Sequence, residues 1–178
     1  MLKVNVKHHT LDNGLKIILA KDKSNPIISL QLYVKVGSVH EKAHESGFSH
    51  LMEHLVFKST ANYPDNKIME TASFLGANIN AYTEYDSTCH YLTLPSKYTE
   101  KGLELLSELA MNANFSNDEF YTEKKVVIEE LKQYANDPEE NFVEKIPLYY
   151  FEESPYHNPI IGHLDNLEQS TPEDLQVF

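Results

Sequence analysis

The segment GFSHLMEHLVF, residues 47–57, decides the fold of this chain. Most of its residues are apolar, and its polar residues are chiefly two histidines and one glutamate. A helix that is apolar nearly all round is typically a buried helix. The sequence therefore predicts that this segment forms a helix inside the molecule, with polar side chains whose burial must be compensated.

The polar residues of this helix are His50, Glu53 and His54, which form an H-x-x-E-H motif. At about 100° per residue, the two histidines lie within about 40° of each other and one turn apart. Two imidazoles in that arrangement can bind one zinc ion. Glu53 lies on the neighbouring flank, where it can take a proton from a water molecule on the metal and return it to a leaving amine. The alternative is a pair of buried histidines without a metal.

A catalytic zinc site needs a third protein ligand, and a later helix offers candidates. A Ser-x-x-Glu capping box predicts that this helix starts at about residue 117, and its pattern runs to about residue 134. On a helical wheel, Glu123 and Glu130 lie together at the edge of the apolar stripe, whereas Glu129 points to solvent. One of the two inward glutamates can bind zinc while the other orients a histidine.

Outside these two helices the pattern predicts an α+β fold, with an antiparallel-rich sheet and helices packed on one face. We expect a single domain, residues 1–178, without internal repeats or linkers. A helix start near its end suggests a catalytic domain that is incomplete at its C-terminal side. Strands are expected at residues 2–10, 15–20, 26–36, 77–83 and 87–94, and further helices at residues 64–75, 98–111, 146–151 and from 171 onward.

The composition argues against several classes of partner. The formal net charge is -12, from 15 Lys and Arg against 27 Asp and Glu, and nucleic-acid binding needs clustered basic side chains. No apolar run is long enough to span a bilayer, so no membrane partner is expected. The single cysteine, Cys89, excludes an intrachain disulfide and favours a reducing compartment. Because the first ten residues lack the apolar core of a signal peptide, we expect a cytoplasmic protein.

Residues 47–60 resemble the active-site helix of the pitrilysin family of zinc metallopeptidases, which includes insulin-degrading enzyme and mitochondrial processing peptidase. The distal glutamate of that family lies in a later run similar to residues 123–130. The resemblance implies that Glu130 is the third zinc ligand and that Glu123 is an auxiliary glutamate beside it. It agrees with the choice of inward-facing glutamates from the helical wheel.

The resemblance extends over nearly the whole chain. Residues 11–15 look like the opening hairpin of the family, residues 76–83 like the strand that borders its cleft, and residues 155–162 like a later loop. One departure near the motif is Ser49, where the family commonly has a small alanine. In that family the substrate adds as a strand to a sheet edge, which implies a substrate-binding role for Asn80, Ala81 and Tyr82.

These features predict a zinc-dependent endopeptidase that hydrolyses peptides or unfolded polypeptide segments. The resemblance implies a partner domain or a homologous subunit that closes a chamber, and we expect the chain to bind zinc but to have little activity alone. One alternative is a non-catalytic scaffold or assembly subunit, although such relatives usually lose ligands or the base. Another is a structural zinc site, but these favour four protein ligands, often cysteines.

Overall fold

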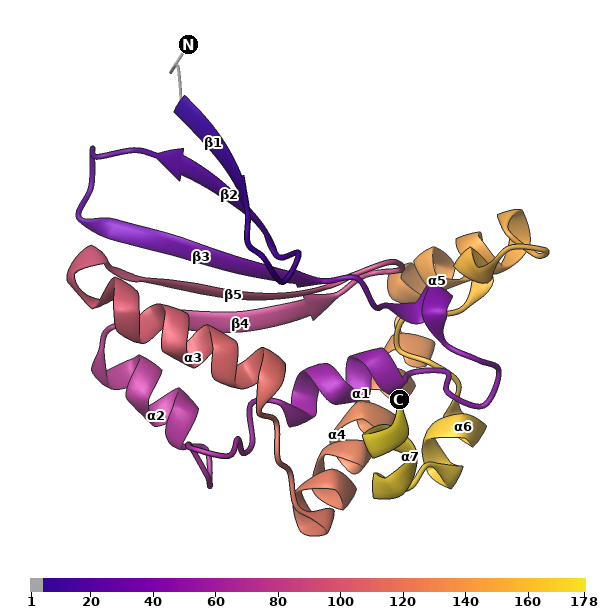
Figure 1. Cartoon of the computed structure of the whole chain (residues 1–178). Coiled ribbons are helices and arrows are strands. Elements are labelled where there is room, and N and C mark those ends of the chain that lie inside the picture. Colours follow the sequence, from indigo (N-terminus) through magenta and orange to yellow (C-terminus); the bar gives the residue numbers. More distant parts are fainter. Residues whose placement is uncertain (1–4) are drawn as a thin grey trace.

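The computed structural model describes residues 5–178 (Figure 1). The predicted start of the first strand, residues 2–4, lies outside the described residues. The strands are β1 (Asn5–Thr10), β2 (Lys16–Lys21), β3 (Ile27–Val34), β4 (Asn78–Thr83) and β5 (Thr88–Pro95). The helices are α1 (Phe48–Leu55), α2 (Lys67–Phe74), α3 (Thr99–Met111), α4 (Asn117–Asn136), α5 (Pro138–Tyr150), α6 (Leu164–Gln169) and α7 (Pro172–Val177), with short 3-10 turns η1 (Ser38–His40), η2 (Ser96–Tyr98) and η3 (Pro155–His157).

Strands β3, β5 and β4 form an antiparallel sheet in that order, so β4 is an edge strand among the described residues. The register aligns Leu30, Leu92 and Ile79 on one face, as alternation along each strand requires. Helices α2 and α3 cover this face (Figure 1), and their apolar residues pack with it into one core. These features confirm the predicted α+β class with helices on one face of the sheet.

Helix α1 lies between two hydrophobic cores. On one side it packs against α4 and the C-terminal helices through Leu51 and Leu55, and on the other it meets the sheet core through Val56. Met52 contacts both cores. The prediction that the H-x-x-E-H segment forms a buried helix is therefore confirmed. The helix packs against other elements on two sides.

The N-terminus of α1 is fixed by two further features. Gly47, in the left-handed region at φ 93°, lies so close to Gly162 that a Cβ on Gly162 would come within 2.4 Å of the Gly47 Cα. The buried carboxylate of Glu41 accepts hydrogen bonds from the backbone N–H groups of Gly47 and Ser49, both at 2.8 Å. A carboxylate at this end satisfies free donors and complements the helix dipole.

Strands β1 and β2 form the predicted hairpin, but as a separate two-stranded sheet. Every residue of both strands is exposed, and Figure 1 shows the hairpin projecting away from the three-stranded sheet. A two-stranded hairpin alone buries little apolar surface. The alternation of apolar and polar residues thus predicted the two strands, but it did not predict that both would be exposed.

Some helix boundaries differ from the prediction. Helix α2 begins at Lys67 instead of Pro64, because Asp65 and Asn66 adopt positive φ of 54° and 62° and so cannot belong to an α-helix. Helix α6 was not predicted at all. No helix within residues 5–178 is both long and apolar enough to cross a membrane.

The largest difference concerns α5, which was predicted only from residue 146. It begins at Pro138, directly after α4, because Asp137 ends one helix and caps the next. The Asp137 side chain accepts hydrogen bonds from the backbone N–H groups of Glu139 and Glu140. Proline at the first position of a helix follows the usual preference, so Asp-Pro here starts a helix as well as stopping one.

Candidate metal centre

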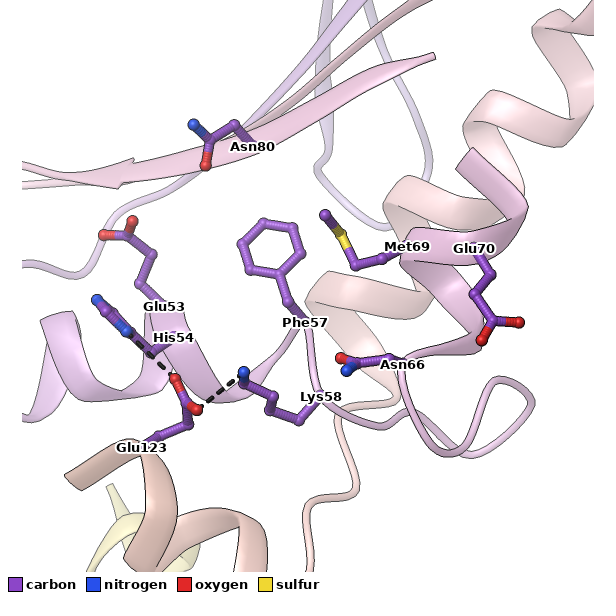
Figure 2. Close-up of a pocket in the computed structure, with 9 residues that line it drawn as sticks. All are labelled: Glu53, His54, Phe57, Lys58, Asn66, Met69, Glu70, Asn80 and Glu123. Atoms are coloured by element: carbon purple, nitrogen blue, oxygen red, sulfur yellow. Dashed lines mark ion pairs between the residues drawn. The ribbon is translucent and has the colours of Figure 1, made fainter. Parts of the chain in front are cut away.

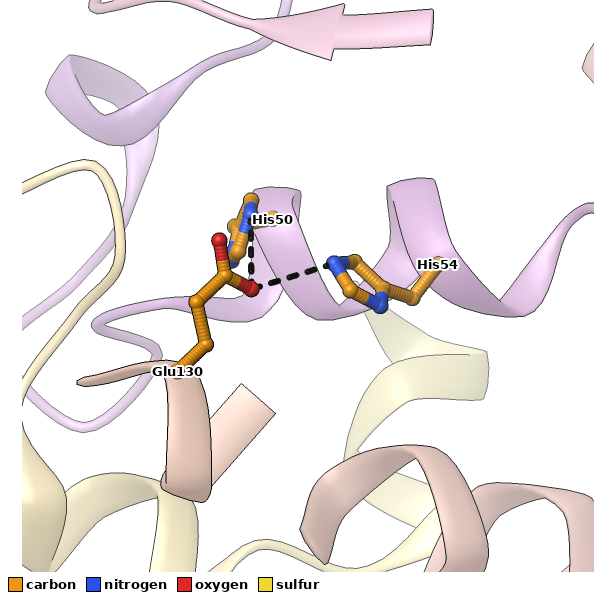
Figure 3. Close-up of side chains that lie close together, drawn as sticks. All are labelled: His50, His54 and Glu130. Atoms are coloured by element: carbon orange, nitrogen blue, oxygen red, sulfur yellow. Dashed lines mark ion pairs between the residues drawn. The ribbon is translucent and has the colours of Figure 1, made fainter. Parts of the chain in front are cut away.

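Helices α1 and α4 face each other and bring three donor groups together (Figure 3). Glu130 Oε2 lies 4.0 Å from His50 Nε2 and 3.6 Å from His54 Nε2. One donor atom from each of the three residues lies within 4.8 Å of the others. This is the spacing that a single small cation between them would need, and the two helices supply it from positions 76 residues apart, 54 to 130.

The donor set fits zinc. Two imidazole nitrogens and one carboxylate oxygen make three protein ligands, and the four-coordinate catalytic sites of zinc enzymes keep the fourth position for water. The side chains are 13%, 23% and 28% exposed for His50, His54 and Glu130, so the cluster is sheltered but reachable. Burial, together with the neighbouring His54, lowers the pKa of His50 to about 4, which keeps its imidazole neutral and able to donate a lone pair.

Glu130 is held by its own helix. Its second oxygen, Oε1, accepts a hydrogen bond from the hydroxyl of Tyr134, one turn further along α4, at 3.1 Å. Oε2 is thereby left for the histidines. The adjacent Glu129 pairs instead with Lys132, and its side chain is 65% exposed. The prediction from helical phase, with Glu130 inward and Glu129 in solvent, is confirmed.

Glu123 lies next to His54, and Figure 2 marks the ion pair between the two side chains. Its side chain is only 8% exposed, and Oε2 lies 3.4 Å from His54 Nδ1. Its other oxygen, Oε1, is 2.8 Å from the ammonium group of Lys58. The carboxylate therefore orients His54 with Nε2 towards Glu130, and Lys58 supplies the cation that a buried carboxylate needs.

Glu53 lies beside this cluster, and its carboxylate is held from the sheet. Thr83 donates a hydrogen bond from its hydroxyl to Glu53 Oε2 at 2.5 Å. Burial raises the pKa of Glu53, while the bond from Thr83 and the proximity of His54 act in the opposite direction. A carboxylate with a raised pKa is a stronger general base than an exposed one.

A cavity of about 580 Å³ opens next to Glu53 and His54 (Figure 2). It extends from the motif helix towards α2, with Phe57 and Met69 as its apolar wall. Asn80 of β4 also lines it. Of the three donor residues, His54 lines this cavity, which is large enough for a peptide side chain.

The predicted substrate residues lie on the edge strand β4. Asn80 is exposed, and its side-chain oxygen accepts a hydrogen bond from the backbone N–H of Ala81 at 2.9 Å. Ala81 itself is buried, so only its backbone can serve an added strand. Tyr82 is 36% exposed, and its hydroxyl lies 2.9 Å from the hydroxyl of Tyr33 on β3. β4 is packed against α1, which places this edge beside the cluster.

Three residues of the site were missed by sequence reasoning. Thr83 and Lys58 contact Glu53 and Glu123 across elements, and no spacing within one helix indicates such contacts. Tyr134 was given no role by the sequence reasoning. Its spacing of four residues from Glu130 was the signal that could have revealed the hydrogen bond.

Comparison with known proteins identifies the family of the chain. Residues 16–163 match the family described as Insulinase (peptidase family M16). The chain belongs to this family. One relative is a protein of Rickettsia felis named "Uncharacterized zinc protease", which is 29% identical over 177 residues, 99% of this chain. The chain spans 43% of the length of that relative.

Two solved structures resemble the fold closely. One is a protease from Helicobacter pylori, with a TM-score of 0.87 and 30% identity, which covers 99% of this chain and 43% of the other. The second is an M16 inactive domain from Pseudomonas fluorescens, with a TM-score of 0.88 over 97% of this chain and 42% of the other. At 18% identity, this second likeness shows the fold alone. The chain therefore matches about half of each of these proteins.

Proposed function

We propose that this chain is the catalytic half of a zinc-dependent endopeptidase that hydrolyses peptides or unfolded polypeptide segments. The observation that carries the proposal is the convergence of His50, His54 and Glu130, with Glu53 beside them. We assign the first three as zinc ligands and Glu53 as the general base. The name of the Rickettsia felis relative supports a zinc protease, and membership of the family supports a peptidase.

In this mechanism His50, His54 and Glu130 hold the ion, and Glu123 keeps the ring of His54 in the orientation that binding needs. Bound zinc would polarise a water molecule and lower its pKa towards neutrality. The Glu53 carboxylate, held by the Thr83 hydroxyl, receives the proton of the attacking water. The same carboxylate then delivers a proton to the leaving amine, so that the base is regenerated.

The substrate is proposed to lie along the free edge of β4 as an added strand. Backbone pairing at Asn80, Ala81 and Tyr82 provides affinity with little demand on sequence, because every peptide offers the same donors and acceptors. A strand paired to Ala81 N–H would take over the place of the Asn80 side-chain oxygen. The acidic surface, with a net charge of -12, favours basic segments among the possible peptides.

The protein relatives are longer than this chain, which spans 43% of the first of them. We propose that residues 1–178 are a single domain of the catalytic unit and that a second half, on the same polypeptide or on another subunit, closes the chamber. The isolated chain then binds zinc but hydrolyses little. Adding the second half should raise hydrolysis, and no gain on mixing would contradict the need for it.

The second candidate is a non-catalytic assembly subunit of the same family. The inactive domain from Pseudomonas fluorescens has this fold, so the fold does not distinguish the two. The presence of all three donors, the base and Glu123 favours catalysis here. A purely structural zinc site is less consistent with three protein ligands and an adjoining cavity.

The test is Glu53→Gln in the chain supplied with its second half. Zinc content should stay the same, because Glu53 is not a ligand, and turnover of a quenched peptide should fall by about 10²–10⁴-fold, the usual contribution of a general base. Glu129→Gln on the exposed side of α4 is the matched control and should keep full turnover. Turnover that survives Glu53→Gln would show that the base is assigned wrongly.

A further inference from the structure

The carboxylate of Glu53 is tied to a different element from the one that carries it. Glu53 belongs to α1, whereas Thr83 is the last residue of β4. The Thr83 hydroxyl donates the 2.5 Å hydrogen bond to Glu53 Oε2, and the Thr83 backbone also favours the ionised carboxylate. The hydroxyl of one element thus fixes the carboxylate of the other through Oε2.

Thr83 is itself firmly placed. It pairs with Thr88 of β5 in the antiparallel ladder. The turn that follows is closed by a hydrogen bond from Glu84 N–H to Ser87 O at 2.8 Å. The hydroxyl that holds Glu53 thus projects from a strand end with little freedom to move.

A glutamate at this position needs such a holder. His54 and Glu130 lie close enough to influence Glu53, one attracting its charge and the other repelling it. Without a fixed partner, rotation of the carboxylate towards His54 would take its oxygen away from the attacking water. Misplacement of a catalytic group by about 1 Å can cost on the order of 100-fold in rate.

We propose that Thr83 is the positioning residue of the general base, and that it links the orientation of Glu53 to the strand on which the substrate is bound. This inference rests on the proposed function. Thr83 follows Asn80, Ala81 and Tyr82 directly in β4, so a peptide paired along this edge orders the same strand that holds the base. Substrate docking and base alignment then share one rigid element.

The competing explanation is that Thr83 serves only the strand, since threonine is common in sheets. Valine and serine substitutions separate the two roles. Thr83→Val keeps the branched shape and the strand preference but removes the hydroxyl, whereas Thr83→Ser keeps the hydroxyl and loses a methyl group. If Thr83 positions Glu53, activity is lost in Thr83→Val and kept in Thr83→Ser. If Thr83 serves only the strand, Thr83→Val keeps the activity.

The experiment compares both variants with the unaltered protein, each supplied with the second half. Thr83→Val should lower kcat by about 10- to 100-fold, which corresponds to the loss of one hydrogen bond to a charged group. KM should stay within about 2-fold and the zinc content should not change, since neither ligands nor substrate contacts are altered. Thr83→Ser should stay within about 3-fold of the original kcat.

Crystal structures of the two variants provide a readout that does not depend on activity. The Glu53 carboxylate should take more than one orientation in Thr83→Val and a single orientation in Thr83→Ser. Thr88→Val is the matched control, because it removes a hydroxyl from the paired residue of β5 that bonds only to backbone. It should lower the midpoint of thermal unfolding while leaving kcat unchanged.

Unchanged kcat and a single Glu53 orientation in Thr83→Val would overturn the inference. So would a Thr83→Ser variant as slow as Thr83→Val, or a loss that appears in KM or in zinc content. Turnover by Glu53→Gln would instead overturn the assignment of Glu53 as the base in the proposed function. In that case the variant structures still decide whether Thr83 holds the carboxylate.

Discussion

Helices α4 and α5 follow each other directly, since Asp137 ends the first and caps the second, yet their surroundings differ. α4 packs against α1 and α6 and buries Phe120, Glu123 and Val127. α5 packs against α4 and the η3 turn and buries no residue completely. Both helices carry aromatic and acidic residues, so composition does not account for the difference. What differs is the element that each one faces.

This comparison explains why the proposed third metal ligand lies on α4. A ligand must be held to within a few tenths of an ångström, and a helix clamped between α1 and α6 can hold Glu130 in that way. The acidic residues of α5 lack such support. The packing of α4 is therefore what holds its carboxylates in place. This link can be tested by changing equivalent residues on α4 and α5.

The largest difference is expected for phenylalanine truncation. Phe120 on α4 is fully buried, whereas Phe142 on α5 is 66% exposed. Phe120→Ala should lower the free energy of unfolding by about 3–5 kcal/mol because it leaves a cavity in the core, and Phe142→Ala should change it by less than about 0.5 kcal/mol. Urea unfolding followed by circular dichroism measures both. Similar losses in the two variants would mean that α5 is as well packed as α4.

The next difference lies within α4 itself. Glu130→Ala should weaken zinc binding by more than about 100-fold, because changes in groups that merely orient a ligand already cost about 10- to 100-fold. Glu129→Ala, one residue away on the exposed side, should leave the affinity within about 2-fold. Competition with a zinc-binding dye measures both, and zinc should raise the thermal midpoint only where Glu130 is intact. Equal affinities in the two variants would remove Glu130 from the ligand set.

The contrast between Glu129 and Glu130 also shows what the sequence could establish. The direction of a side chain on a helix follows from its position, so the spacing of apolar residues was enough to place Glu123 and Glu130 inward. The same reasoning placed the two histidines of α1 one turn apart. Elements with a local pattern were predictable, including the capping box that opens α4 and the strands of the sheet.

Contacts between distant elements were not predictable in this way. The bond from Thr83 to Glu53 and the ion pair of Lys58 with Glu123 depend on how α1 packs against β4 and α4, which no local pattern encodes. Exposure was equally hard to read, since α5 has apolar residues without a face that buries them. The substrate roles on β4, the domain extent and the cytoplasmic location stay predictions.

The smallest difference concerns Glu144, the acidic residue of α5 that lies partly buried. Burial raises its pKa above the ordinary value of 4.5, and the charge of Glu140 one turn earlier acts in the same direction. Tyr134 on α4 and Tyr85 between β4 and β5 also lie near its charge. Nothing on α5 plays the part that Lys58 plays for Glu123, because the described residues give Glu144 no ion pair.

The sign of the pH effect follows from this direction. The pKa of Glu144 is raised in the folded state, so the protonated carboxyl favours folding. This contribution to stability is complete at a pH below the pKa of the unfolded state and is lost as the pH rises through the pKa of the folded state. Glu144→Gln removes the charge, so its thermal midpoint should match the original protein near pH 4 and exceed it at pH 7 by less than about 4 °C, the shift that roughly 1 kcal/mol gives in a domain of this size. Glu139→Gln at the exposed start of α5 is the control for loss of charge. A Glu144→Gln variant that is less stable at pH 7 would mean that the ionised carboxylate is stabilised by the α4–α5 contact, and α5 would then resemble α4 more closely than its exposure indicates.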